Sequence, residues 1–184
     1  MAKQSVFRDF MLALKKHWES EFSFVKPLEE SRGTLPKASS FYAGRSKSTG
    51  LHVYLYFQHS SKAWQVGQFT INVVLSKVES PDRGRHRWQS KDGGLEEGSY
   101  RIGNLIGSDE KWWHLKESKP LLVTPTLPPR RAHDWRPTNY NDIHVVIQEA
   151  VADVSRDMAT VFQRLGVGNQ SRPEGTRELS RGPA

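Results

Sequence analysis

The sequence predicts an α+β fold in which an antiparallel sheet of roughly four to five strands is covered by an N-terminal helix and a long C-terminal helix. Two observations lead to this prediction. Residues 51–76 contain two apolar, β-rich runs on either side of a polar break, which is the pattern of a β-hairpin. Apolar residues recur at helical spacing in residues 5–22 and again in residues 143–165. Because a lone hairpin is marginally stable, we expect these helices to cover it.

The N-terminal helix is expected over residues 5–22. Ser5 can cap its start, and Pro27 requires that it end beforehand. Steps of three and four residues place its large apolar side chains in one stripe, which we assign to the core: Phe7, Phe10, Met11, Leu14 and Trp18.

Each strand of the hairpin alternates with period two, so each has an aliphatic face. The first strand places Leu51, Val53, Leu55 and Phe57 on one face and His52, Tyr54, Tyr56 and Gln58 on the other. The second strand alternates in the same way from Phe69 to Leu75. Trp64 and Val66 have the opposite parity from Phe69, which predicts a bulge and a kink at Gly67.

Shorter strands are expected on either side of the hairpin. Residues 39–43 fit a short edge strand with Phe41 or Tyr42 pointing inward. A short strand is predicted over residues 100–106, and Trp112 begins another extended segment. Residues 120–126 fit a last edge strand, because prolines exclude them from the middle of a sheet. Residues 128–137 read as a stiff, basic linker.

The C-terminal helix has the clearest pattern in the chain. Thr138, Asn139 or Asn141 can cap it, and Gly166 predicts its end. Its apolar stripe consists of Ile143, Ile147, Ala150, Val154, Met158, Val161 and Leu165. We expect this stripe to pack on the aliphatic face of the hairpin. A homodimer seam along Ile143–Leu165 is the less favoured alternative to a monomer.

Length and composition indicate one domain over residues 1–167 and a disordered tail over residues 168–184. The 184 residues are 36% hydrophobic and 26% charged, with a net charge of +7 and a pI near 9.7. This balance favours an acidic partner such as nucleic acid or an acidic protein, and it is also compatible with an ordinary solvated surface. The chain contains no cysteine, which excludes disulfides, thiolate nucleophiles and Cys-ligated metals.

The start of the chain does not resemble a signal peptide, because Arg8 and Asp9 break its apolar run. No run of the sequence is apolar enough to span a bilayer. We therefore expect a cytoplasmic protein with no membrane partner.

Chemistry-bearing motifs are missing. The sequence holds no P-loop, no dinucleotide-binding glycine pattern, no H-E-x-x-H and no G-x-S-x-G. The seven histidines are not spaced as metal ligands on one helical turn. We therefore predict no catalytic residue, no metal and no cofactor, and we favour a non-enzymatic protein. An enzyme without a recognisable motif remains an alternative, with Arg101, His114 and the acidic turn near residue 109 as its polar groups.

Two groups of residues are candidate binding sites. The first is the aromatic and polar face of the hairpin, with His52, Tyr54 and Tyr56. The second is a polar loop in which basic residues surround a tryptophan: Arg83, Arg85, Arg87 and Trp88. Charge for phosphate beside a ring for a base is typical of a nucleic-acid contact. A solvated loop whose tryptophan packs back on the sheet is the alternative.

A further segment runs from Tyr100 through Arg101 and Ile102 to Leu105, followed by the pair Trp112 and Trp113. In these pieces the chain resembles the small bacterial proteins of domain-of-unknown-function family 4304. The resemblance extends over residues 5–165 and implies an α+β fold with no assigned activity. Arg101, Trp112 and Trp113 are further binding candidates, and we expect a guanidinium stacked on an indole.

Three functions follow as hypotheses. The leading one is a bacterial binding protein of the accessory, immunity or defence type, with a protein partner. The second is nucleic-acid binding through Tyr54, Tyr56 and the basic loop, with Arg130 and Arg131 adding charge. The third is the enzyme without a recognisable motif.

Overall fold

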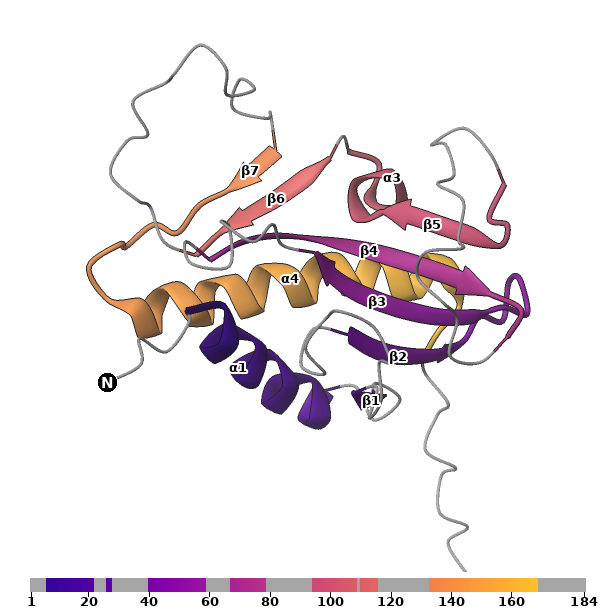
Figure 1. Ribbon diagram of the computed structural model, residues 1–184, viewed down its shortest axis with the longest axis horizontal. Helices are drawn as coiled ribbons and strands as arrows, with labels where there is room; N and C mark the ends of the chain where they lie inside the picture. The colour runs from indigo at the N-terminus through magenta and orange to yellow at the C-terminus, as the bar shows by residue number, and fades with distance from the viewer. Residues whose placement is uncertain are drawn as a thin grey trace, which may run out of the picture.

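The computed structural model of the chain describes residues 6–21, 26–27, 40–58, 67–78, 94–108, 110–115 and 133–168. The helices are α1 (Val6–Glu21), the short α3 (Ile102–Ile106) and α4 (Ile143–Leu165). The strands are β1 (Lys26–Pro27), β2 (Ser40–Arg45), β3 (His52–Gln58), β4 (Gln68–Ser76), β5 (Gly98–Arg101), β6 (Lys111–His114) and β7 (His133–Trp135). This arrangement confirms the predicted α+β class (Figure 1).

The sheet has the strand order β1-β2-β3-β4-β6-β7, and β5 also pairs with β4. All pairs are antiparallel except β6 and β7, which run parallel. The sheet is therefore mixed and has seven strands, two of them only two and three residues long. The sequence predicted fewer strands and a purely antiparallel sheet, because short strands lack a period that can be recognised.

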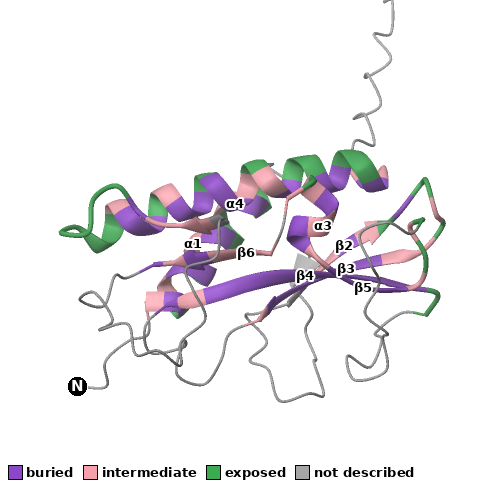
Figure 2. Cartoon of the chain, turned by 90° about the horizontal axis from the view of Figure 1, so that it is seen from above, coloured by how far each residue is buried: buried purple, intermediate pink, exposed green. Residues whose placement is uncertain are grey.

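The three helices of the described residues lie on one side of the sheet, which we call the core face (Figure 2). The aliphatic side chains of the hairpin point to this side, with Val53 opposite Leu75 and Leu55 opposite Val73. Val53, Leu55, Val73 and Leu75 are fully buried, together with the stripe of α1 and the α4 stripe from Ile147 to Leu165. Ile143, which the sequence also placed in this stripe, is 37% exposed at the start of α4. The predicted packing of the C-terminal helix on the hairpin is thus confirmed, and its stripe is used within the chain's own core.

The N-terminal helix agrees with its prediction residue by residue. Phe7, Phe10, Met11, Leu14 and Trp18 are all buried. The Trp18 ring meets Phe41 of β2 edge-on, with ring centroids 5.1 Å apart. It also lies 6.5 Å from the Phe162 ring of α4, so this one side chain joins both helices to the sheet.

The ends of α4 show one correction. Its N-cap is Asp142, whose carboxylate accepts a hydrogen bond from the His144 backbone N–H, and not Thr138, Asn139 or Asn141. Asp is as good a cap as Asn, so four neighbouring polar residues left the start ambiguous in the sequence. Gly166 ends the helix in the left-handed conformation, with φ at 60°, as predicted.

The segment after β5 also differs from the sequence prediction. β5 ends at Arg101, and Ile102–Ile106 forms the helix α3 where a continuing strand was expected. Ile102 and Leu105 are three positions apart, which puts both on the buried side of one helical turn. Gly107, with φ at 78°, closes this turn.

The strands at the two ends of the sheet refine the sequence prediction. β2 includes the expected 40–43 segment and buries Phe41 in the core, while β1 lies outside it, so β2 is not the last strand. The register shifts between Tyr42 and Gly44, so the structure has a bulge in β2. At the opposite end, His133–Trp135 is a strand where a linker was expected.

Several sequence predictions concern residues outside the described part of the chain. They are the residues before Gly67 on which the predicted bulge depends, the basic loop with Arg83, Arg85, Arg87 and Trp88, the strand over residues 120–126, the pair Arg130 and Arg131, and residues 169–184 of the predicted tail. Gly67 itself is described and has φ at 70° directly before β4.

Candidate functional site

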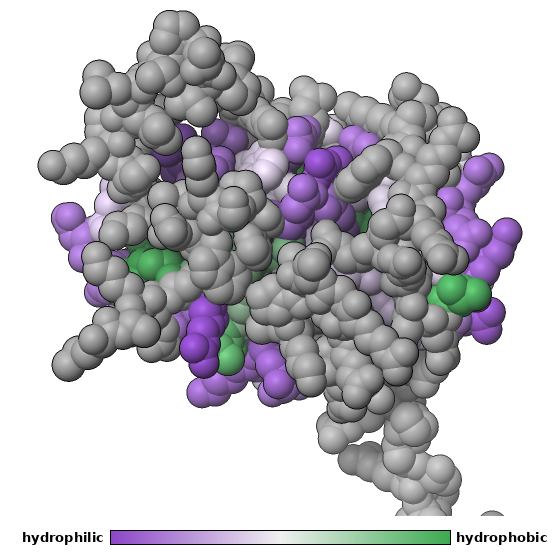
Figure 3. Space-filling view, in the orientation of Figure 1, coloured by the Kyte–Doolittle hydropathy of each residue, from purple (hydrophilic) through white to green (hydrophobic). Residues whose placement is uncertain are grey.

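The sheet has a second face, opposite the helices, that the strand register makes polar and aromatic. Pairing places Tyr42 beside Tyr54, Tyr56 beside Asn72, Asn72 beside Arg101, and Trp112 beside Asp134. No described helix or strand lies on this face (Figure 2). Figure 3 views the molecule as Figure 1 does, with the sheet in front of α4, and most of the described surface visible there is hydrophilic.

The aromatic candidates of the hairpin lie on the second face but are buried. Tyr54 is 2% exposed and Tyr56 is 3% exposed, and they pack with Val74 and the partly buried Tyr42. His52 is half-buried, and its Nδ1 lies 3.0 Å from the hydroxyl of Tyr42. The rings of both tyrosines therefore form part of the packed interior in this structure and do not present an open stacking platform.

Arg101 is a candidate whose side chain is hydrogen-bonded to two neighbouring strands on the second face. Its Nη1 donates hydrogen bonds to Gln58 Oε1 at 2.7 Å and to Asn72 Oδ1 at 2.9 Å. Asn72 in turn donates from Nδ2 to Gln58 Oε1 at 2.8 Å. Arg101 Nε lies 3.6 Å from the Glu110 carboxylate, and the Arg101 side chain is 27% exposed. The guanidinium is thus held in position by two neutral amides and one acid while part of it stays at the surface.

The two neighbouring tryptophans point to opposite faces, because adjacent residues of a strand alternate. Trp113 is buried on the core face and stacks on Phe69, with ring centroids 5.3 Å apart and an interplanar angle of 8°. Trp112 is half-buried on the second face, as is Arg101. The expectation that Arg101, Trp112 and Trp113 pack together is therefore wrong for Trp113. A cation does lie over the Trp113 indole, but it is Lys111, whose Nζ is 4.9 Å from the centre of the ring.

The parallel pair β6–β7 places a histidine beside a carboxylate on the second face. His114 Nε2 lies 3.2 Å from the Asp134 carboxylate, which also has Arg136 Nη2 at 3.8 Å. The side chains of His114 and Asp134 are 14% and 12% exposed. The sequence analysis named His114 as a polar group and did not connect it with Asp134, because their pairing depends on a parallel strand that was not predicted.

We use the name second-face patch for the residues on this face along β3 to β7 and the adjoining turns, all of them half-buried except Asn72, which is buried. It consists of Gln58, Asn72, Arg101, Glu110, Trp112, His114, Asp134 and Arg136. β5 and β6 pair with successive stretches of the same edge of β4, which is why residues so far apart in the sequence share one area.

A second charged cluster lies on the core face, between β6 and α4. Lys111 Nζ donates to Asp153 Oδ2 at 2.7 Å and to Asp157 Oδ2 at 2.6 Å. Trp113 Nε1 donates to the same Asp153 oxygen at 2.9 Å, and Arg156 contacts the other oxygen. Burial raises the pKa of the Asp157 carboxyl, against the opposing effect of Lys111. Asp153 and Asp157 are four positions apart, on adjacent turns of α4, but nothing in the sequence indicates that Lys111 lies between them.

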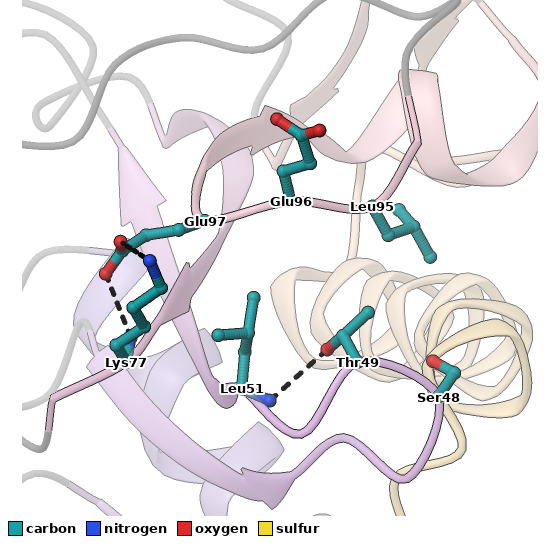
Figure 4. Close-up of a pocket in the computed structure, with 7 residues that line it drawn as sticks. All are labelled: Ser48, Thr49, Leu51, Lys77, Leu95, Glu96 and Glu97. Carbon is teal, nitrogen blue, oxygen red and sulfur yellow. Dashed lines mark hydrogen bonds and ion pairs between the residues drawn. The ribbon is translucent and has the colours of Figure 1, made fainter.

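An open pocket lies at the opposite end of the sheet from β6 and β7. It has a volume of about 420 Å³ and lies between the turn after β2, the end of β4 and the start of β5 (Figure 4). Leu51 and Leu95 line it, with Thr49 and Ser48 on one side and the ion pair of Lys77 and Glu97 on the other. Arg101 and His114, the polar groups named for an unrecognised enzyme, do not line this pocket.

The positive charge of the chain is unevenly distributed. Of its 27 basic and 20 acidic residues, the described part holds 12 and 11, which gives it a net charge of +1. The remaining 15 basic and 9 acidic residues give the rest of the chain a net charge of +6. Electrostatic attraction of an acidic partner would therefore come mainly from residues outside the described part of the chain.

Among the described residues, no group of three or more histidines, aspartates and glutamates is placed to hold a metal ion. None of the described helices is both long enough and apolar enough to cross a membrane.

Comparison with known proteins gives no relative for this chain: no family model, no curated protein and no solved structure matches it. The resemblance to domain-of-unknown-function family 4304 therefore stays a prediction.

Proposed function

We propose that this chain is a non-enzymatic binding protein that recognises a protein partner through the second-face patch. The observation that carries this proposal is the arrangement of Arg101, held by Gln58 and Asn72 on the same face as the half-buried Trp112. Arginine and tryptophan are the residues that most often dominate the binding energy of protein interfaces. A guanidinium that is already fixed loses less conformational entropy when a partner binds.

The environment of the patch supports the same function. Its charged groups occur in both signs, with Arg101 beside Glu110 and Arg136 beside Asp134. Such a surface suits a partner that offers matching donors and acceptors, and it gives no general preference for polyanions. The accessory or immunity role and the cytoplasmic location belong to the same proposal, and the bacterial source draws on the resemblance described above.

Differential capture from an extract of the source cell tests the proposal. The wild-type chain is compared with Arg101→Met and Trp112→Ala, and every captured protein is then purified and titrated by calorimetry. Arg8→Met on the exposed side of α1 and Tyr140→Ala, at a residue that is 47% exposed, are the matched controls. We expect a partner whose affinity falls at least about tenfold with either patch variant, as is usual for central interface residues, and is unchanged by the controls.

Two results contradict the proposal. One is a partner that binds all four variants as tightly as the wild type, which would move the interface elsewhere. The other is the absence of any purified partner that binds the wild-type chain directly. Thermal unfolding of each variant shows whether a loss of binding reflects loss of the fold.

Nucleic-acid binding is the second candidate, and the charge distribution favours it. The net charge of +6 lies in the residues outside the described body, where the basic loop with Arg83, Arg85 and Arg87 belongs. The burial of Tyr54 and Tyr56 argues against stacking on the sheet. Titration of a labelled single-stranded DNA and RNA at increasing salt separates this candidate from the first. Affinity that falls steeply with salt, and that survives Trp112→Ala, supports nucleic-acid binding.

A further inference from the structure

The strand β6 connects the second-face patch to α4, because its four residues alternate between the two faces. Trp112 and His114 belong to the second-face patch. Lys111 and Trp113 point to the opposite side, where both donate hydrogen bonds to Asp153 of α4. Two residues of the patch and the two residues that bind Asp153 therefore belong to the same short strand.

The backbone pairing of β6 with the sheet is short. Two residue pairs join it to β4, Gln68 with His114 and Phe69 with Trp113. The Leu115 backbone N–H adds a bond to the Gly67 carbonyl, and Thr70 Oγ1 donates to the Lys111 carbonyl. On its other side β6 pairs with the three-residue β7, which adds no link to the rest of the sheet among the described residues. Side-chain contacts must therefore contribute much of the attachment of β6 to the body.

The charged cluster supplies such contacts at a buried position. The side chains of Lys111, Asp153 and Asp157 are 15%, 8% and 14% exposed, so the ion pairs are weakly screened by solvent. The groups that face Lys111 are the two carboxylates, the Trp113 ring and, through Asp153, the exposed Arg156. The charges of Lys111 and the exposed Arg156 balance those of the two carboxylates, which makes burial of the lysine and the two acids tolerable.

We propose that Lys111 is a positioning residue: its ammonium group, shared by Asp153 and Asp157, fixes β6 against α4 and so sets the placement of Trp112 and His114 in the second-face patch. The inference deepens the proposed function and rests on it for its biological meaning. Its structural part is independent of any partner. Removal of the cation leaves two carboxylates on adjacent turns of α4 without the charge that joins them, and they repel each other.

Amide hydrogen exchange and the imidazole NMR signals of His114 test the inference in the full chain. Lys111→Met is expected to speed exchange in residues 111–114 by about tenfold or more, as local opening does, and to change the His114 signals. Exchange in β3 is expected to stay within about twofold of the wild type. Lys111→Arg keeps the cation and is expected to restore both readouts. Lys77→Met, which removes another lysine ion pair at an exposed site, is the matched control and should alter neither.

Asp157→Asn is the second variant, in case Lys111→Met does not fold, because it keeps the shape and an acceptor oxygen. It is expected to accelerate exchange in β6 less than Lys111→Met does. Unchanged exchange in β6 in both variants overturns the inference, and so does an equal acceleration in β3 and β6, which would indicate general destabilisation. If β6 loosens as expected but the wild-type chain binds no protein partner, the proposed function fails and the positioning role stands.

Discussion

Ser46 Oγ donates a hydrogen bond of 2.7 Å to the backbone carbonyl of Leu165, 119 positions further along the chain. The turn after β2 thereby caps the C-terminus of α4, where helix carbonyls have no partner within the helix. Ser48 Oγ adds a second bond to the same carbonyl at 3.2 Å, and the Lys47 backbone N–H donates to Gly166. A turn in the N-terminal half of the chain thus holds the C-terminal end of α4.

Ser46→Ala should lower the free energy of unfolding by about 1 kcal/mol, because Ser46 is buried and its hydroxyl also accepts a hydrogen bond from Thr49. The bond from Ser48 limits the loss. Urea denaturation measures the change, with Ser20→Ala as the control, since Ser20 makes its bond at an exposed position of α1. Equal stability of wild type and Ser46→Ala would show that the turn does not support the helix.

Gly67→Ala should be more destabilising than Gly107→Ala, although both glycines have a left-handed backbone. Their φ angles are 70° and 78°. A Cβ at position 67 would lie 2.9 Å from Leu115 Cβ, whereas a Cβ at position 107 meets no atom within 4 Å. We expect Gly107→Ala to lower the free energy of unfolding by about 1 kcal/mol through the backbone alone. Gly67→Ala should lower it by about 2 kcal/mol or more, because β4 and the end of β6 must separate. Similar losses at both sites would contradict the steric part of this prediction.

Asp157→Asn should change how stability depends on pH. Burial raises the pKa of Asp157 in the folded chain above the value of about 3.9 expected in the unfolded chain. The folded state therefore holds this proton more tightly, and its stabilising effect, complete below the unfolded pKa, is lost as the pH rises through the folded pKa. The variant lacks this loss, so its stability relative to the wild type should improve as pH rises across that window. Parallel curves from urea denaturation at several pH values would sink the idea.

Trp18 and Ser155 should show a measurable coupling. Trp18 Nε1 donates to Ser155 Oγ at 3.0 Å, and the indole is 1% exposed. In a double-mutant cycle, Trp18→Phe removes the donor and keeps a ring, and Ser155→Ala removes the acceptor. We expect a coupling energy of about 1 kcal/mol. Additive single-mutant effects would mean that the bond adds nothing beyond the packing of the ring.

The sequence predicted the core correctly because its signals are local. A period of two in residues 51–57 and 69–75, and a period of 3.6 in α1 and α4, fix which side chains share a face without any knowledge of partners. The two faces of the hairpin and nearly every buried residue of the helices follow from these periods.

The second-face patch could not be predicted from these periods. Arg101 meets Gln58 and Asn72 from 43 and 29 positions away, and the contact depends on the register of β4 with β3 and β5. The parallel pairing of β6 with β7 has no periodic signal in strands of four and three residues. Short helices are equally weak in sequence, which is why α3 was read as a strand.

The bond between Trp18 and Ser155 spans 137 positions, and this separation has a consequence for the order of folding. Because synthesis starts at the N-terminus, the residues of α1 and the hairpin are made before those of α4. Until residues 143–165 emerge, α1 can cover only part of the aliphatic face, and Trp18 has no partner in α4. Such distant contacts slow folding, because the loop that joins them must close first. The core can therefore be completed only after residues 143–165 have been made, and a chain cut short before α4 exposes the apolar surface that α4 would have covered.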